Sequence, residues 1–531
     1  MNEFDRKALM VGGTLIAAVA VGSVLFFLRG PQLGLLGVFG AVLMVLCFRY
    51  PRSGIWLFWL YLPFAGSVTY GIGSVFETRL FRNMLLARVS IDGITYAVWQ
   101  LAKDALYLPA LLGMLWQGSV GQNFIREHRG LAIACGLTLG SGLLTLGLVN
   151  LPQEFAGAKG TPFLMGIIGL KVLVFYIPMM LCAQFLLRTT ADLDRFFRIQ
   201  SILVIICCAL CCVQLWLLMQ GVCPGSTELP GNAALRASLR GRCFVGGALL
   251  FNPELKLIRL PGTFASPWQW GWFLIGGCFL VYAGFLRDRK FWRWVHSLAI
   301  AMLLIATSIS GQRTALVLVP LIFIALMSFT IIRDRWLMLK IMSLSGMALL
   351  IVTRLSGISW QLTNLIDRWQ AAPPLRFILR QSQSVFLKDL TLIGRGLGRA
   401  TSAARRLGEI RLIEVFYARI LYEIGIVGLI VYAGLIVTVM IVTWRVWHRL
   451  QTQRFRSLAL CLWLFIAVVS LNTYYYPLAV DPIAVYYWFV VGIILNLSKL
   501  EATVQNPALS DGYRVSPEEV SSAEIPTDLR Q

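Results

Sequence analysis

The chain is a series of long apolar runs separated by short polar connections. Because the bilayer core offers the backbone no hydrogen-bond partners, each run is expected to cross it as a helix. The pattern therefore predicts an all-α polytopic membrane protein with about 12–14 transmembrane helices. We place the expected spans at 8–28, 32–48, 53–70, 104–118, 130–150, 162–187, 199–220, 266–286, 294–310, 314–332, 336–353, 416–443, 457–475 and 482–498.

Composition supports a single membrane domain. The chain is 58% hydrophobic and its mean hydropathy is +0.74. We see no internal repeat and no polar stretch long enough for a separate soluble domain, so residues 1–498 are expected to form one transmembrane domain. The first apolar run is too long for a cleavable signal, and no small-residue cleavage site follows it. Residues 499–531 are acidic and rich in Ser, Pro and Glu, which predicts a disordered tail.

The basic connections assign the two sides of the membrane. With the N-terminus inside, alternate short connections are all rich in Arg and fall on one face, which the positive-inside rule makes the cytoplasm. These connections are RYPR (49–52), REHR (126–129), RTTADLDRFFR (188–198), RDRKFWRW (287–294), RDRW (333–336) and WRVWHRLQTQRFR (444–456). We therefore expect a membrane protein with both termini in the cytoplasm.

Two long loops are expected on the exterior. Residues 221–265 contain Cys223 and Cys243, which form either a disulfide or two free thiols, since spacing alone does not decide. Residues 354–413 carry nine Arg and one Lys against three acidic residues, which gives a net charge of +7. The positive-inside rule does not explain a basic exterior loop, so its charge predicts an anionic partner.

The stretch GRGLGRATSAARRLGEIR (394–411) concentrates this charge beside three glycines. It contains no GxxxxGK[ST] and follows no strand, so it does not predict a nucleotide-binding turn. Outside the cytoplasm the expected anions are lipid phosphates and polyprenyl-pyrophosphate carriers, and nucleic acid is not an expected partner. The planar guanidinium suits phosphate because it donates two parallel hydrogen bonds. The alternative for each arginine is simple docking on anionic headgroups.

Other metal-like motifs have plainer explanations. The sequence ICCALCCV holds Cys207, Cys208, Cys211 and Cys212 within an apolar run without a His or carboxylate nearby, so we interpret them as small apolar residues. Asp192-Leu193-Asp194 matches the DxD pattern of nucleotide-sugar transferases, but it lies in a short connection without a domain to hold a nucleotide. We therefore expect no metal and no cofactor.

Three segments of the chain resemble the O-antigen polymerase and O-antigen ligase superfamily of bacterial envelope enzymes. They are RLPGTFASPWQWGWFL (259–274), SISGQRTALVLVPL (308–321), and LIGRGLGRA (392–400) followed by EVFYARILYEIGIVGL (414–429). GLKVLVFYIPMML (169–181) is similar more weakly. The resemblance covers roughly residues 160–445 and implies a GT-C-like fold in which the large exterior loop carries part of the active site. It also implies that the protein lies in a bacterial cytoplasmic (inner) membrane, with the active site on the exterior face.

The resemblance implies a metal-independent glycosyltransferase that transfers a polyprenyl-pyrophosphate-linked glycan to a hydroxyl of another lipid-linked sugar. Arg313 and Arg259 would neutralise the departing diphosphate, with Arg395 and Arg399 assisting. Ligases of this group carry a His-Asn pair where this chain has Glu414 and Val415, nine residues before Glu423. All three histidines, His128, His296 and His448, are expected in cytoplasmic connections, so Glu414 is the candidate base.

Further residues have two interpretations each. Lys171, inside an expected span, either meets carrier phosphate or reaches to the surface, and Asp481 is a second-choice base. Trp360, Trp369 and Tyr474, Tyr475 and Tyr476 either stack on sugars or form an aromatic interface belt. Glu414 itself has a plain alternative, a carboxylate at a helix start.

Three functions follow from these readings. The favoured one is a polymerase of lipid-linked oligosaccharide repeats on the outer face of the membrane, acting beside a flippase and a chain-length regulator of the same pathway. A ligase would use the same donor and another acceptor. A lipid-linked glycan flippase or transporter is the non-enzyme alternative, and it would need a charged path through several spans.

Overall fold

The computed structural model describes residues 31–72, 94–117, 120–223, 225–227, 229–329, 343, 346, 369–370 and 373–505. The expected spans 8–28 and 336–353, Trp360 and residues 506–531 lie outside this part of the chain. Helices make up most of the described residues, and two short strands pair as the β1-β2 sheet. The fold is therefore that of an all-α, multi-pass membrane protein.

Seven helices among the described residues are long and apolar enough to cross a membrane, or eight when one bent pair counts as a span. The seven are Arg129–Phe155, which joins α8 (Arg129–Thr145), η3 (Leu146–Asn150) and α9 (Leu151–Phe155), together with α12 (Thr190–Met219), α13 (Pro267–Arg287), Phe291–Ile309 within α14 (Lys290–Ile309), α19 (Phe416–Arg449), α20 (Gln453–Leu471) and α21 (Ile483–Gln505). The bent pair is α10 (Pro162–Val174) and α11 (Met179–Leu186), at 43°.

The remaining helices are shorter or less apolar. They are α2 (Pro31–Arg49), α3 (Pro51–Tyr61), α6 (Ile94–Gln117), α7 (Val120–Glu127), α15 (Arg313–Phe329) and α18 (Pro374–Lys388). The expected span 53–70 is interrupted, because α3 ends at Tyr61 and a 3-10 turn and a π turn follow it. Pro63 accounts for the break, since proline removes a backbone donor from the helix.

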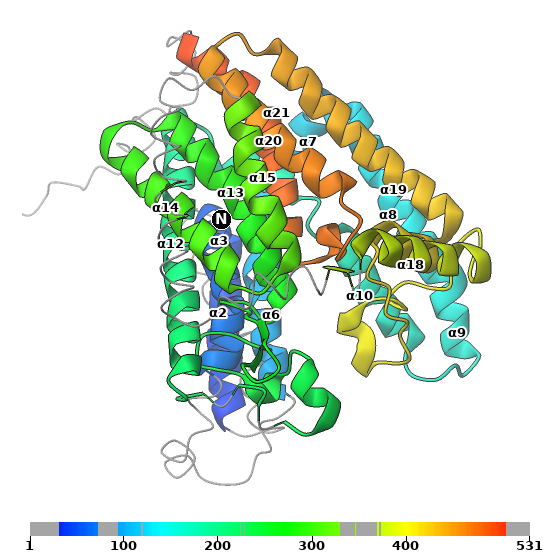
Figure 1. Cartoon of the computed structure of the whole chain (residues 1–531). Coiled ribbons are helices and arrows are strands. Elements are labelled where there is room, and N and C mark those ends of the chain that lie inside the picture. The colour runs from blue at the N-terminus through cyan, green and yellow to red at the C-terminus, as the bar shows by residue number, and fades with distance from the viewer. Residues whose placement is uncertain are drawn as a thin grey trace, which may run out of the picture.

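The centre of the bundle is made of α13 and α21, whose apolar windows are 89% buried. Around them pack α12, α14, α15 and α20, while α2, α3 and α6 contact one another beside α11. Figure 1 shows α8 and α19 running together along one edge of the molecule, with α18 lying across the start of α19. The long exterior loop predicted at 354–413 thus contains a helix, α18, packed on the bundle.

Three helices extend furthest beyond the expected spans. Helix α6 begins ten residues before the expected start at 104, so Lys103 and Asp104 lie inside it rather than at its edge. Helix α12 begins at Thr190, so the predicted connection 188–198 is largely helical. Helix α21 continues to Gln505, and Leu500 and Glu501 in its last turns are buried. In all three places charged side chains lower the hydropathy, and several of them have partners elsewhere in the fold, such as Asp481 for Lys103, Arg287 for Asp194 and Glu127 for Lys499.

The segment 221–265 folds against the end of the bundle where α12 ends and α13 begins. Cys223 and Cys243 form a disulfide with a Cα–Cα distance of 5.6 Å, which decides between the two alternatives left open by the sequence. Strand β1 (Leu250–Asn252) pairs antiparallel with β2 (Leu257–Arg259). We call this end of the molecule the disulfide end and the other, where α13 meets α14, the Asp288 end.

Candidate functional site

Arg259 and Arg313, far apart in the sequence, are brought together by a close backbone approach. The backbone after β2 contacts the turn between α14 and α15, where the Leu260 N–H donates to the Ser310 carbonyl at 3.0 Å. A Cβ at Gly311 would overlap the Ile258 carbonyl, and its φ of +67° also favours glycine. The SISGQR motif therefore needs its glycine for this approach, which places Arg313 beside the end of the hairpin.

The two arginines line one cavity of about 170 Å³ at the disulfide end. Its aromatic wall is formed by Trp369, Tyr474 and Tyr475. Tyr475 and Tyr476 have positive φ values of 55° and 34°, which bulky residues rarely adopt and which concentrate at functional sites. The Trp272 Nε1–H donates to the Tyr475 carbonyl at 3.2 Å and ties this strained turn to α13. The cavity thus combines two cations with flat rings, a lining suited to a phosphorylated sugar.

Glu414 lies next to this cavity and is held by its backbone. The side-chain oxygen of Gln381, on α18, accepts from the N–H groups of Glu414 at 2.9 Å and Val415 at 3.2 Å. Val415 pairs with Tyr474 in an antiparallel bridge, and the Phe416 N–H donates to the Thr473 carbonyl at 2.7 Å. Helix α18 and the tyrosine turn therefore fix the position of the Glu414 backbone from two sides. Sequence reasoning missed Gln381, because nothing in its local pattern marks it.

The electrostatics of Glu414 fit an acid–base role. Burial raises the pKa of its carboxyl, and the neighbouring Arg259 guanidinium lowers it part of the way back. A carboxylate with a raised pKa takes up a proton more readily than an ordinary one. The structure thus brings together Glu414, Arg259 and Arg313, the three residues for which the sequence predicted catalysis.

The glycine-rich stretch forms a packed loop between three helices. Gly394, Gly396 and Gly398 all have positive φ, from 80° to 116°. A Cβ at Gly394 would overlap the Glu423 carbonyl and one at Gly398 the Met165 carbonyl. The side chain of Asn150 donates to the Leu397 carbonyl at 3.0 Å and accepts from its N–H at 2.9 Å. The glycines therefore allow close backbone packing against α10 and α19.

Glu423 anchors this loop from inside the protein. Its Oε1 accepts from the Ala400 N–H at 2.8 Å and the Thr401 hydroxyl at 3.0 Å, and its Oε2 lies 3.6 Å from Arg419 Nε. Gly425 breaks α19 with φ 72° and ψ −170°, which frees the backbone beyond Glu423 for the loop. Glu423 and Arg419 are both nearly inaccessible to solvent. Gly425 therefore introduces a kink within α19, two residues after Glu423.

Arg395 and Arg399 face another group of residues and do not line the cavity that holds Arg259 and Arg313. Arg395 Nε is 3.9 Å from Asp389, which also pairs with Arg411, and Arg399 donates to Gln153 at 2.7 Å. Arg395 remains half-exposed. Arg395 and Arg411 thus flank Asp389, whereas Arg399 is held by Gln153. The predicted contact of Arg395 and Arg399 with diphosphate stays a prediction.

Lys171 and Asp481 belong to a cluster of four charges. Lys171 pairs with Asp104 and Asp481 pairs with Lys103, while Lys103 and Asp104 are neighbours on α6. One oxygen of Asp104, Oδ1, is buried and has no hydrogen-bond partner within the described chain. These pairs neutralise the charges of Lys171 and Asp481, the two residues of the cluster that the sequence offered as candidates for the site. Lys103 and Asp104 were missed because the span had been expected to start at 104.

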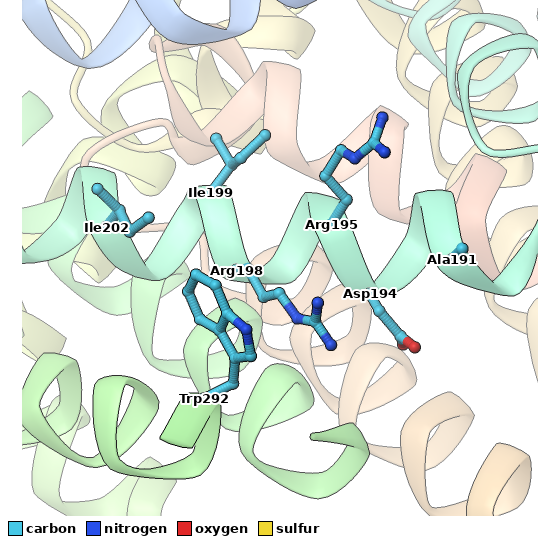
Figure 2. A pocket seen from close by; sticks show the side chains of 7 residues that line it. All are labelled: Ala191, Asp194, Arg195, Arg198, Ile199, Ile202 and Trp292. Atoms are coloured by element: carbon cyan, nitrogen blue, oxygen red, sulfur yellow. The ribbon is translucent and has the colours of Figure 1, made fainter. Parts of the chain in front are cut away.

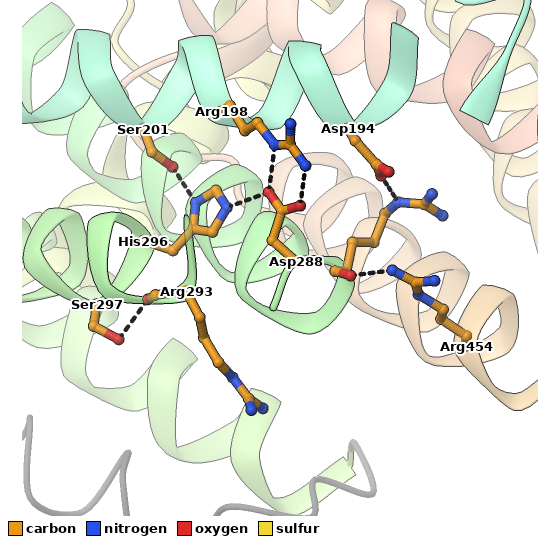
Figure 3. A network of polar contacts seen from close by, with 9 residues as sticks. Asp194, Arg198, Ser201, Asp288, Arg293, His296, Ser297 and Arg454 are labelled. Carbon is orange, nitrogen blue, oxygen red and sulfur yellow. Dashed lines mark hydrogen bonds and ion pairs between the residues drawn. The ribbon is translucent and has the colours of Figure 1, made fainter. Parts of the chain in front are cut away.

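The DxD motif and one histidine have structural roles at the Asp288 end. Asp192 forms a capping box with Thr189 at the start of α12, and Asp194 pairs with Arg287. His296 lies inside α14 and not in a connection, and Figure 3 shows it between Ser201 and Asp288. Its Nδ1 is 2.7 Å from Ser201 Oγ and its Nε2 is 3.0 Å from Asp288. Both Ser201 and His296 are fully buried, so this Ser-His-Asp arrangement has no access for a substrate.

A scan of protein-family models and a search of curated proteins found no match to this chain. The fold and the apolar helices define the class, a multi-pass helical membrane protein.

Proposed function

We propose that the chain is an integral membrane glycosyltransferase, with a GT-C-like fold, that polymerises polyprenyl-pyrophosphate-linked oligosaccharide repeats into surface polysaccharide. One observation carries the proposal: Arg259 and Arg313 line one cavity, and Glu414 is close enough to Arg259 for its pKa to be affected. A cation pair beside a carboxylate is what transfer from a diphosphate leaving group requires.

In the proposed reaction the acceptor hydroxyl oxygen attacks the anomeric carbon of the donor glycan. The bond from that carbon to the diphosphate oxygen breaks, and polyprenyl diphosphate leaves with the electron pair. Glu414 takes the proton of the attacking hydroxyl, and Arg259 and Arg313 neutralise the charge that develops on the leaving diphosphate. Trp369, Tyr474 and Tyr475 offer flat surfaces for stacking on the sugar rings.

The test uses two site variants, Glu414→Gln and Arg313→Ala, in cells that make the polymer. The matched controls are Glu409→Gln and Arg380→Ala, exposed residues of the same loop that do not line the cavity. A polymerase with a defective site loses long chains and accumulates single lipid-linked repeats, while both controls make normal polymer. A ligase instead leaves chains lengthening on the carrier but not attached. Normal polymer in both site variants refutes the proposal.

A lipid-linked glycan transporter remains the second candidate, favoured by the cluster of Lys103, Asp104, Lys171 and Asp481. Charges inside membrane helices are costly and usually functional. The discriminating variant is Lys103→Met with Asp481→Asn, which removes one pair without leaving a lone charge. In a transporter this variant traps repeats in the leaflet where they are made. In a polymerase the repeats reach the opposite leaflet, where they are polymerised.

A further inference from the structure

A second cavity lies at the Asp288 end, opposite the site described above. It has a volume of about 390 Å³ and lies between the first turns of α12 and the start of α14. Its lining residues are Ala191, Asp194, Arg195, Arg198, Ile199, Ile202 and Trp292. Six of these are spaced along α12, and Trp292 is contributed by α14 (Figure 2).

The lining changes from charged to apolar along the helix axis. The arginines are near the start of α12, and Ile199 and Ile202 lie further along, where the helix becomes continuously apolar. Ile202, Ile206 and Leu298 are exposed on the same two helices, as is Trp294. An exposed apolar surface on a membrane-spanning helix faces acyl chains, and tryptophan marks the headgroup level. The cavity therefore runs from the headgroup region into the hydrocarbon region.

The positive charge around the cavity exceeds the carboxylates available to it. Asp194 pairs with Arg287, and Asp288 receives two hydrogen bonds from Arg198, at 2.9 and 2.7 Å, besides its contact with His296 (Figure 3). Arg195 is exposed and pairs with neither aspartate. Near the cavity, Arg195, Arg198, Arg287, Arg289 and Arg454 outnumber Asp194 and Asp288.

One guanidinium that lines the cavity is already held in place by the protein. Arg198 is fixed by its two bonds to Asp288 and lies 5.1 Å from the centre of the Trp292 ring. A phosphate placed between Arg195 and Arg198 would meet one rigid and one adaptable cation. Arg195 can donate a parallel pair of hydrogen bonds to a phosphate, and Arg198 can add the N–H donors that Asp288 does not use.

We infer that this cavity binds an anionic phospholipid of the adjoining leaflet. The phosphate lies between Arg195 and Arg198, and an acyl chain follows Ile199 and Ile202 past the Trp292 ring. A small phosphate ion would use only the charged half of the cavity, which is why a lipid is the better occupant. The inference is independent of the proposed glycosyltransferase activity, because the two sites lie at opposite ends of the bundle.

The test measures lipid binding to the purified full-length chain by native mass spectrometry, with phosphatidylglycerol, phosphatidylcholine and inorganic phosphate as probes. We expect phosphatidylglycerol to bind more tightly than phosphatidylcholine. Arg195→Gln is expected to lower the affinity for phosphatidylglycerol by about 10-fold or more, the loss expected for one charge-assisted contact. Trp292→Ala is expected to weaken the binding of both lipids. The matched control is Arg289→Gln, which removes the same charge from an exposed arginine of this end that does not line the cavity.

Three results would overturn the inference. They are equal binding of the two lipids, equal weakening by Arg289→Gln and Arg195→Gln, and displacement of the lipid by inorganic phosphate at millimolar concentration. A second measurement needs no variant. A phosphatidylglycerol with a photoreactive acyl chain should label peptides of the wild-type chain that contain Ile202 or Trp292, and labelling confined to other helices refutes the site.

Discussion

The buried pair of Arg419 and Glu423 is expected to hold the glycine-rich loop in place, and Glu423→Gln tests this directly. The substitution keeps the shape of the side chain and a carbonyl oxygen that accepts from Ala400 and Thr401. It removes the negative charge 3.6 Å from Arg419, whose side chain is 6% exposed. Breaking a buried ion pair on one side typically costs about 3–5 kcal/mol, because the remaining charge stays buried without compensation.

This cost has a local and a global readout. If the loop opens alone, amide exchange at Gly396 and Ala400, which are bonded to Glu423, accelerates by between about 100- and 4,000-fold. If the loop and α19 unfold together, the apparent melting temperature of the protein in detergent falls instead. The matched control is Glu409→Gln, since Glu409 is 80% exposed and its contact with Lys159 is 3.8 Å long. Exposed pairs of this kind contribute little, so neither readout should change.

The double variant Arg419→Gln with Glu423→Gln completes the argument. It removes both charges, so we expect it to be more stable than Glu423→Gln alone. If Glu423→Gln behaves like Glu409→Gln in both readouts, the ion pair does not hold the loop and the reasoning is wrong. If the double variant is less stable than the single one, Arg419 is compensated by another group, such as the Tyr476 ring that lies 5.8 Å away.

Three further predictions concern the site and the loops. Glu414 acts as a base only when deprotonated, so activity is expected above the pKa of its carboxyl and is lost below it. Since the Arg259 guanidinium lowers this pKa, Arg259→Gln should raise it and shift the acidic limb of the pH–rate profile to higher pH. A limb that stays in place contradicts the pairing. Gly398→Ala should cost at least about 1–2 kcal/mol of stability for its positive φ alone, measured as a lower apparent melting temperature. The control Gly434→Ala, at a helical glycine where a Cβ meets open space, should leave the melting temperature unchanged. Alkylation of the unfolded, unreduced chain should modify nine cysteines, and reduction before alkylation should raise the number of adducts, measured by mass spectrometry, to eleven. Eleven adducts without reduction would exclude the Cys223–Cys243 bond.

Several features of the site follow from patterns that the sequence displays locally. Arg259 and Arg313 each stand in a short motif with a glycine, and the glycines of 394–398 mark the tight loop. The sequence alone did not predict Gln381, Arg419 or the pairing of Lys103 with Asp481. Each of these residues acts through a partner far away in the chain, and no local spacing marks such a partner. The start of α6 was misplaced for the same reason, since Lys103 and Asp104 look like a helix boundary until their partners are known.

The sequence by itself determined that this chain is a multi-pass helical membrane protein, because the length and hydropathy of an apolar run are local properties and the bilayer leaves a helix as its only solution. The tertiary structure decided which polar residues meet. It joined Cys223 to Cys243, brought Arg259 and Arg313 to one cavity, and gave Arg395 and Arg399 other partners, Asp389 and Gln153. It also buried His296 within α14, where a connection had been expected. These outcomes depend on how helices far apart in the chain pack, and the energy of a buried charge or hydrogen bond is set by its partner and not by its neighbours in sequence.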